Sequence, residues 1–153
     1  FARRLTANTE MTVNGPAAGH DLLKTNADPT GKKVLGTLNN CANGKTPWGT
    51  YLACEENFHY YFVHDPKPSK DADTERRWQR YKLGFSYYGW QQFDQRFDLD
   101  KEPNEANRFG WVVEFDPYNP NSTPVKRTAL GRFAHENVAH KVASIFKIFS
   151  VSF

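Results

Sequence analysis

Residues 110–118 read Gly-Trp-Val-Val-Glu-Phe-Asp-Pro-Tyr, and they show the fold class most clearly. On a pleated strand, Trp111, Val113 and Phe115 share one face, while the two residues between them point to the other. The cluster of Asp, Pro and Asn over residues 116–121 is typical of a turn. The stretch therefore predicts a β-strand that ends in a turn.

Three other short runs follow the same rhythm of apolar and β-branched residues between Gly, Pro, Asn or Asp groups. They are Lys33 to Leu38, Gly49 to Cys54 and Thr123 to Leu130. Short strands separated by turns at this spacing predict an all-β fold.

Residues 66–107 differ from the rest because charged and aromatic side chains dominate them. Trp78, Tyr81 and Phe85 stand at i, i+3 and i+7, which is typical of a short amphipathic helix. We interpret the segment as a long insertion between strands whose aromatic side chains pack on the β body. An alternative is a platform for a sugar or nucleobase, formed by Tyr87, Tyr88, Trp90, Phe93 and Phe97.

Composition narrows the class of protein. The chain has 153 residues, of which 39% are hydrophobic and 15% aromatic, so it can form a core. Its net charge of +3 comes from interleaved charges without a basic tract, which argues against a nucleic-acid partner. No run approaches the roughly 20 apolar residues that span a membrane. The chain begins at Phe1 without a signal segment, and we interpret it as part of a longer protein.

Residues 36–58 hold both cysteines and two adjacent carboxylates, so chemistry is expected here. A thiolate beside carboxylates indicates a mixed metal site around Cys41. A disulfide between Cys41 and Cys54 is the structural alternative. A nucleophilic Cys41 would need an activating histidine, and no histidine lies near it in the sequence.

Glu55 and Glu56 are consecutive, so on a strand their side chains point to opposite faces. Both enter one site only if the strand bends or ends there, which the Asn57 that follows would allow. The alternative is a pair of solvated surface charges.

His135, Glu136 and His140 invite comparison with the zinc-protease helix motif. That motif places its histidines at i and i+4, whereas here they stand at i and i+5, about 140° apart on a helix, so the protease interpretation fails. His20 follows a glycine-rich turn and receives no predicted role.

Two segments carry a resemblance to a known family. The Asn-Asn-Cys, Thr-Pro-Trp-Gly-Thr and Cys-Glu-Glu-Asn-Phe elements of residues 36–58, and residues 107–137, resemble PhoX-type alkaline phosphatases. The resemblance covers residues 1–137 and implies part of a β-propeller, namely one to two blades plus a long insertion, incomplete as it stands. Residues 138–153 match no motif. They are either an edge strand or, as we prefer, an artefact of a truncated or frame-shifted reading frame.

The resemblance also implies a function. It implies an exported, periplasmic or extracellular enzyme, monomeric when complete, that uses Fe³⁺ and Ca²⁺ to hydrolyse small phosphate monoesters. The residues that match the family's metal ligands are Cys41, Glu55, Glu56 and Glu136. His135 and Asn137 would support the ligands or the fold. We expect this chain alone to be inactive. The alternative is a non-catalytic β-propeller binding module that lacks a functional metal centre.

Overall fold

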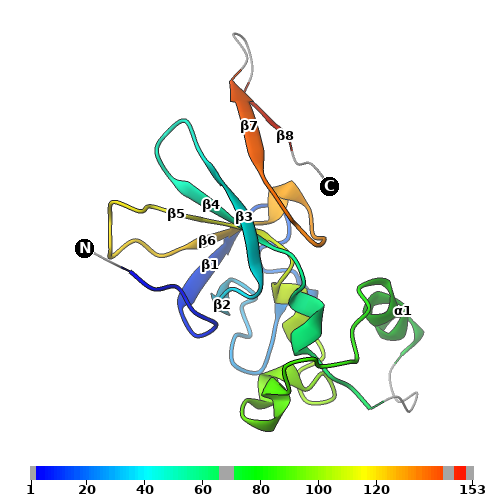
Figure 1. Ribbon diagram of the computed structural model, residues 1–153. Helices are drawn as coiled ribbons and strands as arrows, with labels where there is room; N and C mark the ends of the chain where they lie inside the picture. The colour runs from blue at the N-terminus through cyan, green and yellow to red at the C-terminus, as the bar shows by residue number, and fades with distance from the viewer. Residues whose placement is uncertain (1–2, 66–70, 143–146, 151–153) are drawn as a thin grey trace.

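The computed structural model describes residues 3–65, 71–142 and 147–150 and centres on one six-stranded mixed sheet (Figure 1). Neighbouring strands run antiparallel, except that β1 and β6 are parallel. The strand order is β2 (Lys33–Leu35), β1 (Glu10–Asn14), β6 (Val125–Arg127), β5 (Val112–Phe115), β4 (Tyr51–Glu55) and β3 (Asn40–Lys45).

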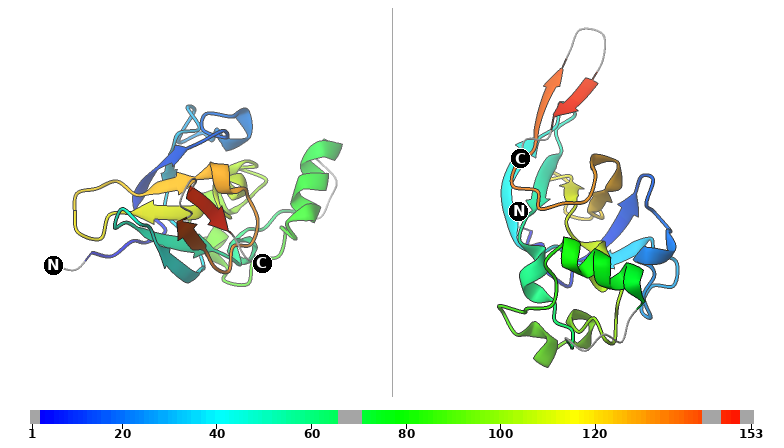
Figure 2. Two further views of the ribbon diagram at one scale, coloured as in Figure 1. Left: turned by 90° about the horizontal axis from the view of Figure 1, so that it is seen from above. Right: turned by 90° about the vertical axis from the view of Figure 1, so that its right-hand side faces the viewer.

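The predicted strands are confirmed in β2, β4, β5 and β6, and the fold is mostly β. The sheet is open, with β2 and β3 at its two ends, so the described residues form no closed propeller. A separate antiparallel hairpin, β7 (Ala139–Val142) with β8 (Lys147–Ser150), extends beyond the sheet (Figure 2).

Strand β5 forms the centre of the sheet and is buried on both faces. Val112 and Val113 are fully buried, and Glu114 is only 7% exposed. Val112 lies opposite Cys54 of β4 and opposite Arg127 of β6. The alternation of residues 111–115 therefore separates two buried faces.

The expected insertion lies between β4 and β5 and covers one side of the sheet (Figure 1). The chain between β4 and β5 contains η2 (Phe58–Tyr61), which precedes the predicted insertion, and then α1 (Ala72–Arg80), η3 (Trp90–Gln92), η4 (Gln95–Phe97) and η5 (Glu105–Arg108). Elsewhere, η1 (Asp21–Leu23) and η6 (Thr128–Leu130) are short 3-10 turns. No helix in the described ranges is long and apolar enough to cross a membrane.

Helix α1 begins where Asp71 accepts hydrogen bonds from the backbone amides of Asp73 and Thr74. Trp78 is buried, as the helical spacing predicts. Phe85 was expected on the same face, but it is 71% exposed. The reason is that α1 ends at Arg80, and Lys82 then adopts φ 54°, a left-handed conformation that turns the chain away.

The main core lies between the sheet and the insertion and is rich in aromatic side chains. Its buried members include Leu38, Phe58, Tyr61, Phe62, Trp78, Phe97 and Phe109. Phe97 is buried in this core, whereas Phe93 is 90% exposed. The predicted sugar or nucleobase platform is therefore not a single surface.

Candidate functional site

Three chain segments meet where β4 ends. The Glu56 amide donates to the Asn39 carbonyl (3.1 Å), and the Ala42 amide donates to the Glu136 carbonyl (2.9 Å). These bonds bring the backbones around Cys41, Glu56 and Glu136 together from β3, β4 and the segment before β7. The sequence places these three residues up to 95 positions apart, from 41 to 136.

A β-bulge presents Cys41 to solvent. Asn40 pairs with Glu55 and Asn43 with Ala53, so two residues of β3 face one residue of β4 between these pairs. Cys41 is exposed while Cys54 on β4 is buried, and both are free thiols. The disulfide alternative is therefore not formed in this structure.

Negative charge gathers around the Cys41 thiol. Its pKa is raised above the usual range, first by partial desolvation and then by a hydrogen bond to Glu56 and the charges of Glu56 and Glu136. A thiol in such a setting stays protonated and is a poor nucleophile. The same arrangement favours a cation, which would neutralise both carboxylates and stabilise the thiolate.

Glu55 does not face the cluster of Cys41, Glu56 and Glu136, although β4 ends at Glu55. Its side chain is fully buried, and Oε1 lies 2.7 Å from Lys126 Nζ. Oε2 accepts hydrogen bonds from the amides of Gly110 (2.9 Å) and Trp111 (3.0 Å). The expectation that Glu55 is a metal ligand is not supported by this arrangement, because its charge is already neutralised by Lys126.

The donor chemistry fits part of a metal site. Cys41 offers a soft sulfur, and Glu56 and Glu136 offer hard oxygens, the combination expected for a mixed centre. Within residues 3–65, 71–142 and 147–150, no group of three His, Cys, Asp or Glu side chains is arranged to hold an ion by itself. The cluster would thus need ligands beyond those of the described residues.

Sequence reasoning missed three residues around the cluster. Asn39 adopts φ 47°, and its Oδ1 accepts a hydrogen bond from the Asn57 amide (3.1 Å). His59 lies near Glu56 and Lys82; burial and the Lys82 charge lower its pKa, and the Glu56 charge opposes them. The Asn39-Asn40 pair was a usable signal, since asparagine tolerates this conformation. Lys126, the third, gave no local signal.

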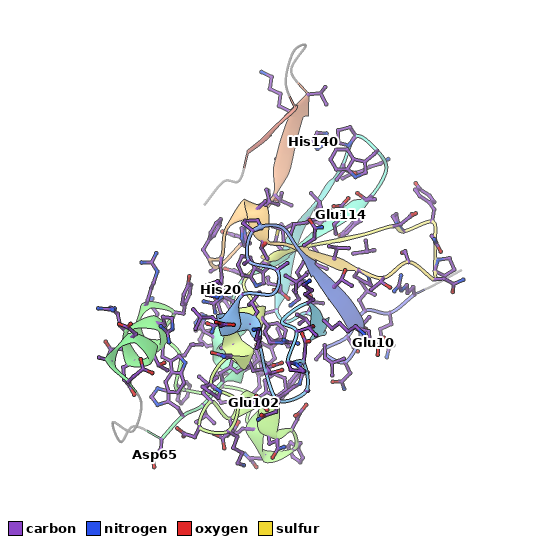
Figure 3. All side chains as sticks on the ribbon, turned by 180° about the vertical axis from the view of Figure 1, so that it is seen from behind. Glu10, His20, Asp65, Glu102, Glu114 and His140 are labelled. Atoms are coloured by element: carbon purple, nitrogen blue, oxygen red, sulfur yellow. The ribbon has the colours of Figure 1, made fainter. Side chains whose placement is uncertain are left out.

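The histidines of the second segment are held separately. His135 is fully buried and its Nε2 donates to the Gly131 carbonyl (3.0 Å), which leaves Nδ1 without a hydrogen-bond partner among the described residues. His140 lies on β7, beyond the sheet (Figure 3), so the two do not share a helix. Asn137 Oδ1 accepts from the Val138 amide, and His20 Nδ1 accepts from the Leu22 amide at the start of η1.

Comparison with known proteins identifies the family to which this domain belongs. The model of the family described as "Alkaline phosphatase PhoX" matches residues 1–146, so the chain belongs to the PhoX alkaline phosphatase family. This match includes the first residues of the segment after 137, for which the sequence showed no motif. The recognition from sequence is confirmed. No curated protein matched the chain.

A solved structure supports the same assignment. The chain is 54% identical to PhoX from Pseudomonas fluorescens, whose structure contains vanadate, a transition state analogue, with a TM-score of 0.83. The similarity covers 94% of this chain and 24% of that protein, so this chain spans about a quarter of the length of that relative.

Proposed function

We propose that the complete protein is a metal-dependent alkaline phosphatase that hydrolyses phosphate monoesters. The observation that carries this proposal is the convergence of Cys41, Glu56 and Glu136 from three segments of a PhoX domain. The relative with bound vanadate adds support, because vanadate mimics a phosphoryl group in transfer.

In this proposal Cys41, Glu56 and Glu136 supply part of the ligand set for Fe³⁺ and Ca²⁺. Such ions, held by these residues and by ligands from the rest of the protein, would supply charge neutralisation for the phosphoryl oxygens. The chain's own residues hold the ligands in place: the bulge in β3 aims Cys41, and the backbone bonds of Glu56 and Glu136 fix their segments. The remaining ligands belong to the rest of the protein.

The complete protein would close into a β-propeller and would act as an exported monomer on small phosphate esters. The competing proposal is a non-catalytic propeller module. The charge cluster favours the enzyme, since a thiol flanked by the charges of Glu56 and Glu136 offers both the soft and the hard donor atoms that a mixed metal centre uses.

Metal analysis of the purified complete protein, combined with hydrolysis of a chromogenic phosphate monoester before and after chelation, tests the proposal. Bound iron and calcium together with chelator-sensitive hydrolysis are expected. A protein that binds no metal and hydrolyses nothing would instead be the binding module.

A further inference from the structure

Glu55 is the most heavily bonded side chain near the cluster. Its Oε1 accepts hydrogen bonds from Lys126 Nζ (2.7 Å) and from the Leu38 amide (3.4 Å). Its Oε2 accepts from the amides of Gly110 and Trp111, directly before β5. A carboxylate has about four acceptor positions, and here all four are used by protein donors. No acceptor position is left for a metal ion, and the side chain is fully buried.

The contacts of Glu55 reach every segment that carries a ligand of the proposed centre. Leu38 lies three residues before Cys41. The Glu55 carbonyl accepts a hydrogen bond from the His135 amide (2.9 Å), directly before Glu136. The third segment is joined covalently, because Glu56 is the next residue. One residue thus connects all three segments.

Lys126 makes this connection possible because it neutralises the buried carboxylate. Its Nζ is fully buried and donates to Glu55 and to the Arg108 carbonyl (2.8 Å). It also lies 3.9 Å from the centre of the Phe109 ring. A buried charge without such a partner is strongly destabilising, so the two residues act as a unit.

We propose that Glu55, neutralised by Lys126, is a positioning residue that sets the relative placement of Cys41, Glu56 and Glu136. The inference rests on the proposed metal centre. Glu55 acts through its neighbours: its carboxylate anchors the chain before Cys41 to β5 and β6, and its carbonyl anchors the chain before Glu136. A shift of any segment would separate the ligands and weaken metal binding.

The test uses four variants of the complete protein, with metal affinity measured by chelator competition and thermal unfolding measured without metal. Glu55→Gln keeps all proposed ligands but leaves Lys126 uncompensated, so we expect a lower Tm and a metal affinity about 10- to 100-fold weaker. Full metal content is expected to return at excess metal. Glu56→Gln removes a ligand, and excess metal is expected not to restore full content.

The double variant Glu55→Gln/Lys126→Met removes both buried charges together, so neither is left without a partner. The glutamine oxygen can still accept hydrogen bonds from the amides of Gly110 and Trp111. We expect it to fold and to bind metal within about 10-fold of the wild type. The control Glu114→Gln alters another buried glutamate, which pairs with Arg127 and has no contact with Glu55 or Lys126 among its hydrogen bonds and ion pairs. It is expected to lower the Tm and leave metal affinity unchanged.

Two results would overturn the inference. If Glu55 were a ligand, the double variant would lose metal as completely as Glu56→Gln. If Glu55 served only stability, Glu55→Gln would lower the Tm as Glu114→Gln does, with unchanged metal affinity. Should Glu55→Gln fail to fold, the double variant still decides between ligand and positioning residue. A wild-type protein without metal would instead overturn the proposed function.

Discussion

Cys41 and Cys54 lie on the paired strands β3 and β4, yet their thiols are unlinked, and the bulge leaves Cys41 exposed while Cys54 is buried. Burial is the main cause that raises the pKa of Cys54 to about 11, and the charge of the nearby Cys41 thiolate is the second. The two thiols therefore differ in access and in acidity. That difference makes them separable by chemical modification.

The first prediction is that Cys41 is shielded from alkylation in the metal-loaded complete protein and reacts once a chelator removes the metal. Cys54 is expected to stay unmodified in both states because it is buried. Mass spectrometry of the alkylated peptides measures both. A peptide pair joined through Cys41 and Cys54 in the metal-loaded protein would contradict the ligand role.

The second prediction concerns Glu136, the exposed carboxylate of the Cys41, Glu56 and Glu136 cluster. Glu136→Gln preserves shape but removes the charge that a hard cation needs, so we expect loss of metal and of hydrolysis with the fold retained. Glu10→Gln is the matched control, because Glu10 is an exposed glutamate on β1 (Figure 3). Metal content by elemental analysis and circular dichroism provide the measurements. Wild-type metal content and turnover in Glu136→Gln would show a structural role.

The third prediction is an acid-dependent loss of stability through Asp28. Burial opposes ionisation, but hydrogen bonds from Thr30, the Lys33 amide and Arg108 outweigh it and lower the pKa of Asp28 to about 2. The pKa of Asp28 in the folded protein lies below the unfolded value of 3.8. The ionised carboxylate therefore contributes about 2 kcal/mol to the free energy of unfolding above pH 4. This contribution is lost as the pH falls from about 4 to about 2.

Denaturant unfolding of the metal-free protein at several pH values measures this effect. Asp28→Asn is expected to lower stability at pH 6 and to flatten the decline below pH 4. Identical pH profiles for wild type and variant would show that Asp28 does not contribute.

The fourth prediction is that Lys126→Met alone destabilises the protein by about 3–5 kcal/mol, since it leaves the Glu55 carboxylate buried without a counter-charge. Lys141→Met, at an exposed position on β7, is the control and is expected to change stability by less than about 0.5 kcal/mol. Equal unfolding free energies for the two variants would mean that Glu55 becomes protonated at little cost.

Local sequence patterns predicted the elements that depend on near neighbours. The strand at residues 110–115 and the buried Trp78 follow from alternation and helical spacing. The predicted position of Phe85 on the buried face was wrong, because the left-handed conformation of Lys82 turns the chain after the helix ends. The spacing of apolar side chains does not indicate where a helix ends. The family resemblance implied only an incomplete part of a β-propeller, and the described residues show one open six-stranded sheet.

The site was predicted in part for the same reason. Strand geometry predicted opposite directions for Glu55 and Glu56 unless the strand ended there. Strand β4 does end at Glu55, yet Glu55 pairs with Lys126 while Glu56 lies beside Cys41. Which of them faces Cys41 depends on Lys126, 71 positions from Glu55. A lysine on a short strand usually indicates a solvent-facing position, so only the three-dimensional arrangement reveals the buried pair.

The last prediction is that the 153-residue chain alone shows no hydrolysis of a generic phosphate monoester, even with iron and calcium supplied. Its sheet has two open ends, at β2 and β3, which in an isolated domain expose unpaired backbone groups. The described residues also contain no three-ligand group, so highly charged ions would remain hydrated. Size-exclusion chromatography with an activity assay on each fraction measures the outcome. Metal-dependent turnover that coincides with a monodisperse peak of this chain would show a self-contained site and would reject the shared-ligand proposal.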